Sequence, residues 1–131
     1  MKRLLFSVLM MTCSVSWAEW NLLVDDEKIS YWIDRNSIRK AGAISKVWTM
    51  TSHSALKVNK SGYRYKSTKS LYAYDCNNEV MALLSLVFHA NSMGTGEVLQ
   101  SWTYTSNEIE WDHIVPNTVS ELEWKIACGK K

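Results

Sequence analysis

The chain of 131 residues, with 47% hydrophobic residues and a formal net charge of +2, is long enough for one domain with a real core. It has one proline, no low-complexity tract and no repeat of a solenoid period, which excludes a linker-rich or repeat protein. No apolar run reaches the roughly 18 residues that a membrane-spanning helix needs, so we expect a water-soluble protein.

The first 18 residues have the pattern of an export signal. Lys2 and Arg3 form a positive segment, and a short apolar stretch follows at 4–11. The tripeptide Ser16-Trp17-Ala18 then places small residues at the two positions that a signal peptidase reads. We therefore predict a signal peptide over 1–18 and a single exported domain over 19–131. The destination beyond the inner membrane is either the cell surface and outer membrane or the periplasm.

Cys13 lies inside this segment and is a poor site for lipid attachment. A bacterial lipoprotein signal places a small residue just before the modified cysteine, whereas Met10-Met11-Thr12 precedes Cys13. We interpret Cys13 as part of the discarded peptide, and lipid attachment is the minority alternative.

Two cysteines, Cys76 and Cys128, remain in the predicted mature chain. In an oxidising compartment such a pair, with no CxxC spacing, is most simply a disulfide. The three histidines His53, His89 and His113 are scattered without ligand spacing, so we expect no metal site and no cofactor.

Strand-like segments predominate between these cysteines and before them. We predict strands over 20–24, 29–35, 44–54, 68–76, 80–90 and 97–105. The acidic residues 25–27, Asn77-Asn78 and the glycine-bearing residues 91–96 are the predicted turns. Residues 34–45 are predicted as a short helical or irregular turn.

The last part of the chain breaks this pattern. Thr118 is followed three residues later by Glu121, which is the spacing of a capping box. Val119, Leu122 and Ile126 then recur at helical spacing, with Ala127 beside them, and we predict that they form the apolar face of a C-terminal helix. The sequence thus favours an α+β fold, with an antiparallel sheet of about five to six strands, a helix packed on it and one disulfide.

Charge is segregated along the chain. Residues 28–69 contain ten basic residues and one acidic residue, whereas 70–124 contain eight acidic residues and no Lys or Arg. Two interpretations stay open, namely opposite surface potentials or neutralisation across neighbouring strands.

Sequence signatures of enzymes are absent. The chain has no GxSxG, no HExxH, no phosphate-cradling glycine loop and no Rossmann fingerprint. The pair Asp112-His113 is more typical of a polar turn than of a catalytic triad. We expect a protein that is not an enzyme.

The most unusual local feature is the segment 57–69, here called the basic arm. Basic residues with interleaved tyrosines can hold an acidic protein surface, a sulfated glycan or nucleic acid, and export makes nucleic acid the least suitable partner. The alternative is a solvated hairpin without a ligand. The candidate partner-binding residues are Lys57, Lys60, Tyr63, Arg64, Tyr65, Lys66 and Lys69.

Four stretches, "YWIDRNSIRKAGAISKVW", "STKSLYAYDCNN", "NSMGTGEVL" and "WDHIVPNTVSELEWKIAC", resemble in order and spacing the surface-adhesin protein E-like domains of Gram-negative bacteria. The resemblance covers about 20–128 and implies a sheet with a helix against it. It also implies an adhesin-like module that binds host extracellular-matrix proteins of the vitronectin and laminin type. The matching residues, which we interpret as structural, are Tyr31, Asp34, Arg35, Tyr74, Asp75, Cys76, Gly94, Pro116 and Cys128.

Two hypotheses therefore follow from the sequence. The protein is an exported binding module for a host matrix protein, an acidic glycan or another macromolecule, or it is a periplasmic envelope protein with a structural role and no host ligand. A small hydrolase is a distant third, and would require the three histidines to converge with an acid in a cleft.

Overall fold

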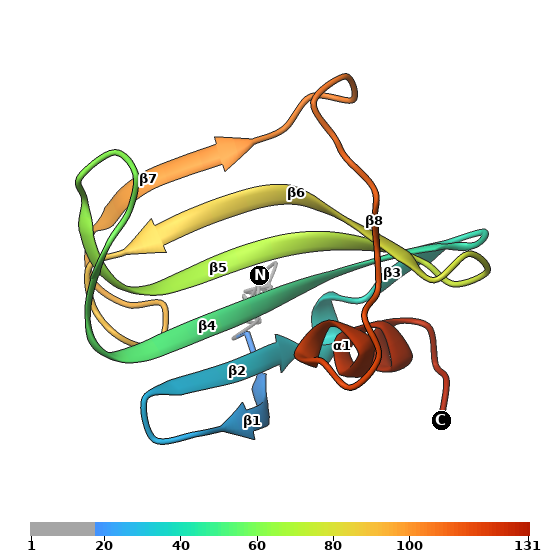
Figure 1. Cartoon of the computed structure of the whole chain (residues 1–131), viewed down its shortest axis with the longest axis horizontal. Coiled ribbons are helices and arrows are strands. Elements are labelled where there is room, and N and C mark those ends of the chain that lie inside the picture. Colours follow the sequence, from blue (N-terminus) through green and yellow to red (C-terminus); the bar gives the residue numbers. More distant parts are fainter. Residues whose placement is uncertain (1–17) are drawn as a thin grey trace, which may run out of the picture.

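The computed structural model describes residues 18–131, which form an eight-stranded antiparallel sheet with one α-helix (Figure 1). Apart from Ala18, the predicted signal peptide lies outside the described residues, and so does Cys13. Within 18–131, no helix is long and apolar enough to cross a membrane. The predicted α+β class, with a sheet and a packed C-terminal helix, is confirmed.

The strands follow one another as a meander with two short additions. Six strands lie in the order β1-β2-β4-β5-β6-β7, while β3 pairs with the start of β4 and β8 with the start of β6. The elements are β1 (Trp20–Asp25), β2 (Ile29–Asp34), the 3-10 turn η1 (Arg35–Ser37), β3 (Arg39–Ala41), β4 (Ile44–Val58), β5 (Arg64–Asp75), β6 (Val80–His89), β7 (Val98–Thr103), β8 (Asp112–His113) and α1 (Val119–Ala127).

The hairpin of β4 and β5 is longer than the sequence predicted. The predicted strands ended at 54 and began again at 68, whereas the ladder continues to Lys57 opposite Tyr65 and Val58 opposite Arg64. Charged side chains at an exposed hairpin end stay in water while their backbone still pairs, so the basic residues did not end the strands. Most of the basic arm is therefore strand.

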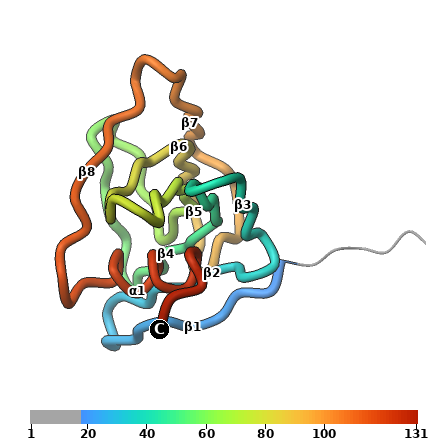
Figure 2. The backbone as a smooth tube through the Cα atoms, turned by 90° about the vertical axis from the view of Figure 1, so that its right-hand side faces the viewer, coloured from blue at the N-terminus to red at the C-terminus, as the bar shows by residue number. Residues whose placement is uncertain are grey.

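The core lies between α1 and one face of the sheet. Ile33, Val47 and Tyr74, from β2, β4 and β5, are fully buried there and form one cluster with Trp124 of α1. Figure 2 views the sheet from its end and shows the segment through β8 descending along one side of the strands to α1. The helix is thus the second layer over one end of the sheet.

The predicted apolar face of the helix is wrong in part. Ala127 is buried as predicted, but Leu122 is 37% exposed, whereas Glu123 and Trp124, which were not predicted, are buried against the sheet. The three buried residues lie at i, i+1 and i+4, on one side of a helix that ends at the disulfide-bonded Cys128. The disulfide and the Glu123 contact, described below, fix this rotation of the helix.

The opposite face of the sheet is covered at one end by the loop 90–97. The Ser52 hydroxyl accepts a hydrogen bond from the Met93 N–H, and the Ser67 hydroxyl accepts one from the Gly94 N–H. Gly94 has a φ of +63°, which side-chain-bearing residues rarely adopt, and a Cβ there would meet the flexible end of the Lys69 side chain. A larger residue at this position would therefore strain the backbone of the loop and displace the Lys69 side chain.

Candidate binding surface at the hairpin of β4 and β5

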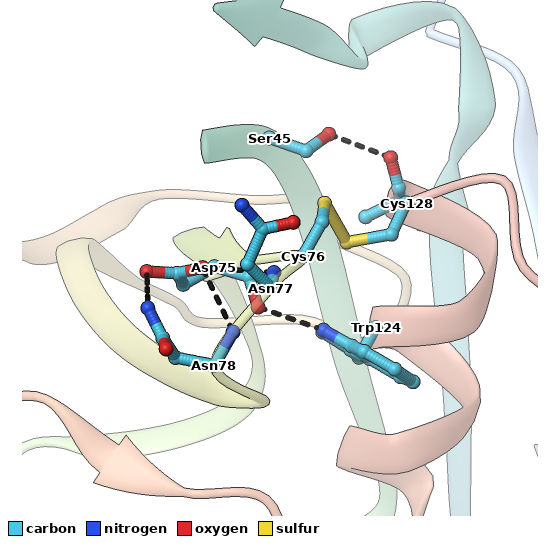
Figure 3. Close-up of a disulfide and its surroundings, with 8 residues drawn as sticks. Ser45, Asp75, Cys76, Asn77, Asn78, Trp124 and Cys128 are labelled. Carbon is cyan, nitrogen blue, oxygen red and sulfur yellow. Dashed lines mark hydrogen bonds between the residues drawn. A yellow bond between two sulfur atoms is a disulfide. The ribbon is translucent and has the colours of Figure 1, made fainter. Parts of the chain in front are cut away.

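One end of the sheet is joined to α1 by covalent and polar contacts (Figure 3). The predicted disulfide is present between Cys76, just after β5, and Cys128 at the end of α1, with 5.5 Å between their Cα atoms. Beside it, the Trp124 indole N–H donates to the Asp75 carbonyl oxygen at 3.0 Å, and the Ser45 hydroxyl donates to the Ala127 carbonyl oxygen at 2.6 Å. Two strand residues, Ser45 and Asp75, and the adjoining Cys76 therefore hold the helix on the sheet.

The turn before β6 is ordered by the Asp75 side chain. One carboxylate oxygen accepts from the backbone N–H groups of Asn77 and Asn78, and the other accepts from the Asn78 amide at 2.9 Å. The Asn78 amide and these two N–H groups lower the pKa of the exposed Asp75 carboxyl. The predicted tight turn at Asn77-Asn78 is thus held by its own aspartate.

A buried acid faces the sheet from α1. The Tyr74 hydroxyl donates a hydrogen bond to a Glu123 carboxylate oxygen at 2.6 Å, and both side chains are buried. Burial raises the pKa of Glu123 to about 7, although the Tyr74 hydrogen bond acts in the opposite direction. Burial likewise raises the pKa of Tyr74. This pair is well suited to positioning the helix, and among residues 18–131 no third titratable side chain is hydrogen-bonded to it.

The other end of the sheet carries the basic arm, whose turn at 59–63 is ordered. The Asn59 side-chain oxygen accepts from the N–H groups of Ser61 and Tyr63 at 3.0 and 2.9 Å. The Gly62 N–H donates to the Asn59 carbonyl, and Gly62 has a φ of +84°, which favours glycine. We call residues 57–64 the arm tip.

The arm tip folds back over the sheet toward β7. The Asn59 amide donates to the Gln100 side-chain oxygen at 3.0 Å, and the Gln100 amide donates to the Ser61 hydroxyl at 3.3 Å. Figure 1 shows this green turn, at the left of the view, reaching past β5 and β6 to β7. The tip is thus tied to a strand some forty residues away in the sequence.

A row of aromatic rings lies beneath the arm tip, across four neighbouring strands. His53 and Tyr65 have ring centroids 5.9 Å apart, Tyr65 and Phe88 4.7 Å, and Phe88 and Trp102 6.1 Å. All three contacts are edge-to-face, the arrangement in which aromatic pairs attract one another. Burial, followed by the charge of Lys57, lowers the pKa of His53.

The structure divides the seven predicted arm residues into two groups. Lys57, Lys60, Tyr63 and Arg64 are exposed at the tip, while Tyr65, Lys66 and Lys69 are half-buried. The Lys69 ammonium lies 5.9 Å from the ring centroid of Trp20 in β1, within cation–π range, so it is away from the tip. Tyr65 belongs to the aromatic row.

Exposed apolar side chains surround the tip, and sequence reasoning missed most of them. Leu56, Val58 and Tyr63 of the hairpin are 51%, 63% and 42% exposed, and Val98 and Trp102 of β7 are 53% and 41% exposed. Val98 and Trp102 are distant from the arm in the sequence. The only sequence signal for their exposure is the alternation of side chains along the strand 98–103. Basic and apolar groups together form a surface suited to a macromolecular partner.

Ion pairs do not neutralise the arm. In the part of the chain that the structure describes, the one ion pair within 4.0 Å is Lys125 with Glu121 on α1, so no carboxylate is paired with a cation of the arm.

Acidic side chains line two other hollows. The acidic turn between β1 and β2 lies at the same end of the sheet as the arm tip and borders, with His53, a hollow of about 230 Å³. Other acidic side chains, Glu108, Glu110 and Asp112, line a hollow beside Leu83 and Tyr104.

Comparison with known proteins places the chain in one family. The structure is similar to Haemophilus influenzae protein E, with a TM-score of 0.62 and 16% identity over 87% of this chain and 86% of that one. It is also similar to the selenomethionine form of that protein, with a TM-score of 0.56 and 17% identity over 76% of this chain and 78% of that one. A third similar structure is protein E from non-typeable Haemophilus influenzae, with a TM-score of 0.53 and 14% identity over 82% of this chain and 75% of that one. No curated protein matches the sequence of this chain. The family model for surface-adhesin protein E matches residues 17–129, so the chain belongs to the surface-adhesin protein E family.

Proposed function

We propose that this protein is an exported, non-enzymatic binding module of the bacterial surface that uses the arm tip to bind an acidic segment of a host extracellular-matrix protein. Membership of the surface-adhesin protein E family supports the adhesin-like role. The observation that carries the choice of surface is the arm tip itself, where Lys57, Lys60 and Arg64 are exposed beside exposed apolar side chains.

The order of the tip favours binding. The turn is held by hydrogen bonds that the Asn59 side-chain oxygen accepts, and it is tied to Gln100, so little conformational entropy is lost when a partner binds. Tyr63, exposed between Lys60 and Arg64, offers a rigid aromatic contact of the kind enriched at interface hot spots. The cations supply attraction to acidic groups, and Tyr63 with its apolar neighbours supplies contact area.

The test compares two triple variants that lose the same charge. Lys57→Ser, Lys60→Ser and Arg64→Ser remove the cations of the tip, and Lys40→Ser, Lys46→Ser and Lys131→Ser remove three exposed cations elsewhere. Binding to immobilised vitronectin, laminin and heparin is measured by surface plasmon resonance for both variants and for the wild type. All three proteins should unfold at similar temperatures, because exposed charges contribute within about 0.5 kcal/mol each.

We expect the tip variant to lose at least tenfold in affinity for one of these ligands, and the control variant to bind that ligand nearly as the wild type does. The wild-type interaction should weaken with salt, since the Debye length falls from about 10 Å at 0.1 M to about 3 Å at 1 M. Equal binding by the two variants would show that the arm tip is a solvated hairpin end and that the binding surface lies elsewhere.

An envelope role without a host ligand is the second candidate, and the poor fit of residues 10–13 to a lipid attachment site favours it. Such a protein could remain in the periplasm. Labelling of intact cells with an antibody against the arm tip separates the two: labelling at the level seen after permeabilisation supports the adhesin, and labelling only after permeabilisation supports the envelope role.

A further inference from the structure

The sheet face that points away from α1 contains a hollow of about 390 Å³. Ile44 and Lys46 of β4, with Leu71 and Ala73 of β5, line it from the strands. Ile44 and Lys46 flank Ser45, whose side chain bonds to α1, so their own side chains lie on the opposite face, and Ala73, which pairs with Lys46, lies there too. This hollow is separate from the arm tip, because its residues pair at the other end of the hairpin.

The hollow exists because small residues lie in the middle of the sheet. Ala73 of β5 stands opposite Ala82 of β6, and both are almost fully buried. Larger side chains, Ile44 and Leu71, stand on either side of Ala73 in the lining. An alanine pair flanked by branched side chains leaves space above it, and this space is the hollow.

The wall comes from the segment that joins β7 to β8, which arches away from the edge of the sheet in Figure 1. Tyr104, Ile109 and Trp111 of this segment complete the lining, and Trp111 is 46% exposed. The Ser85 and Thr103 hydroxyls, which also line the hollow, bond to each other at 3.2 Å. The interior is therefore mainly apolar.

Lys46 is the one charged residue in the lining, and it is exposed at the rim. Its neighbour across the ladder on β3 is another cation, Arg39, and within residues 18–131 no carboxylate lies within 4.0 Å of its ammonium group. The acidic residues at 108–112 line a different hollow, together with Leu83. Leu83 pairs with Tyr72, which packs against the core under α1, so this second hollow lies on the other face of the sheet. The rim of the apolar hollow is thus positively charged.

We infer that this hollow binds a medium-chain fatty acid, with the alkyl chain against Ala73, Leu71 and Trp111 and the carboxylate on the Lys46 ammonium. An apolar hollow with one well-placed charge has the usual anatomy of a small-ligand site, and its volume falls within the range of about 300–1,000 Å³ for such sites. The charge decides the class of ligand, because an anionic head group is attracted to the rim and a cationic one is repelled.

Isothermal titration calorimetry of the mature protein at low salt tests the inference with three ligands of equal chain length. Decanoate should bind with a stoichiometry of one, decanol more weakly, and decyltrimethylammonium more weakly still. Lys46→Gln should lower the affinity for decanoate about threefold, the size expected for an exposed ion pair, and should leave decanol unchanged. Lys40→Gln, an exposed lysine on β3, is the matched control and should change neither.

Trp111→Ala should weaken decanoate and decanol alike, because it removes part of the apolar wall. The inference is wrong if decanoate gives no saturable heat, if decyltrimethylammonium binds as tightly as decanoate, or if Lys46→Gln behaves like Lys40→Gln. Sedimentation experiments test the alternative that the hollow is a surface for a second copy of the chain. In that case decanoate would not bind, the wild type would dimerise and Trp111→Ala would stay monomeric, and the inference would be wrong.

Discussion

The two ends of the long hairpin formed by β4 and β5 are built from the same antiparallel ladder, yet they are closed in different ways. At the α1 end, the Cys76–Cys128 disulfide, the Trp124 indole and the buried pair Tyr74 and Glu123 hold a helix on the sheet. At the arm end, side-chain hydrogen bonds from Asn59 and a row of edge-to-face rings hold a turn over it.

This difference separates stability from recognition. The covalent bridge lies at the α1 end, where the fully buried Ile33, Val47 and Tyr74 also pack with Trp124. The arm tip has weaker individual contacts and leaves its cations and several apolar groups in water. Substitutions at the first end should therefore change the free energy of unfolding, and substitutions of the exposed side chains of the arm tip should mainly change binding.

The largest expected effect comes from removing the disulfide. Cys76→Ser with Cys128→Ser should lower the free energy of unfolding by about 4 kcal/mol in the chain-entropy model, because the bridge closes a loop with a sequence separation of 52. Urea unfolding followed by tryptophan fluorescence measures the change. A loss below about 1 kcal/mol would show that non-covalent contacts alone hold α1 in place.

The next effect concerns the buried Glu123. Its pKa rises from an ordinary value of 4.5 to about 7 in the folded protein, so the unfolded chain ionises first and stability falls as the pH rises from about 4.5 to 7. The shift corresponds to about 3 kcal/mol between the two limits. Glu123→Gln should remove this fall, and the exposed Glu97→Gln should not.

The measurement is the difference in the free energy of urea unfolding between wild type and each variant from pH 4 to pH 8. Wild type and variant must be compared because two histidines also make stability depend on pH. Burial lowers the pKa of His53 and of His89, so both residues destabilise the fold as the pH falls through 6.5. This contribution is the same in both proteins and cancels in the difference. A wild-type curve parallel to that of Glu123→Gln would mean that the acid is not desolvated in solution.

The two neighbouring tyrosines of the arm allow the comparison to be made within one hairpin. Tyr65→Ala should lower stability by about 2 kcal/mol, since the ring packs between His53 and Phe88, and Tyr65→Phe should restore most of it. Tyr63→Ala should change stability by less than about 0.5 kcal/mol and weaken binding to the ligand found for the arm tip. Thermal unfolding and surface plasmon resonance report the two quantities, and equal effects of the two alanine variants on stability would contradict the division.

A smaller loss of stability than that of Tyr65→Ala is expected from a comparison of one asparagine at each end of the hairpin. Asn59→Ala should cost about 1 kcal/mol, because it removes the acceptor of two turn N–H groups and the contact with Gln100. Amide hydrogen exchange at Ser61 and Tyr63 should accelerate while exchange in β5 stays slow. Asn78→Ala, at the opposite turn, serves as the control, and any acceleration at Ser61 in that variant would contradict a local role for Asn59.

Local signals predicted the fold well. The capping box predicted the start of α1, where the Thr118 hydroxyl accepts from the Glu121 N–H at 3.4 Å, and alternation predicted the strands of the main order. The rotation of the helix could not be predicted, because a carboxyl such as Glu123 is buried only when a partner reaches it. That partner, Tyr74, comes from a strand 49 residues earlier.

Sequence reasoning could identify the cations of the candidate surface but not their grouping. The exposure of Lys60 and Arg64 agrees with their charge and their place near a glycine turn. The separation of Tyr63 from Tyr65 depends on the irregular pairing of β4 between Ser52 and Lys57, which redirects the end of the hairpin. Such an irregularity has no local sequence signature here.

The position of the disulfide along the chain has a consequence for mechanical load. A pull between Trp20 in β1 and Gly62 at the arm tip would act on residues 20–62, none of which lies inside the loop closed by Cys76 and Cys128. The hydrogen bonds of β1, β2 and β4 would carry this tension, and the covalent bridge would not limit the extension. Under such a force the module would lengthen from its first strands while α1 stayed fastened to β5.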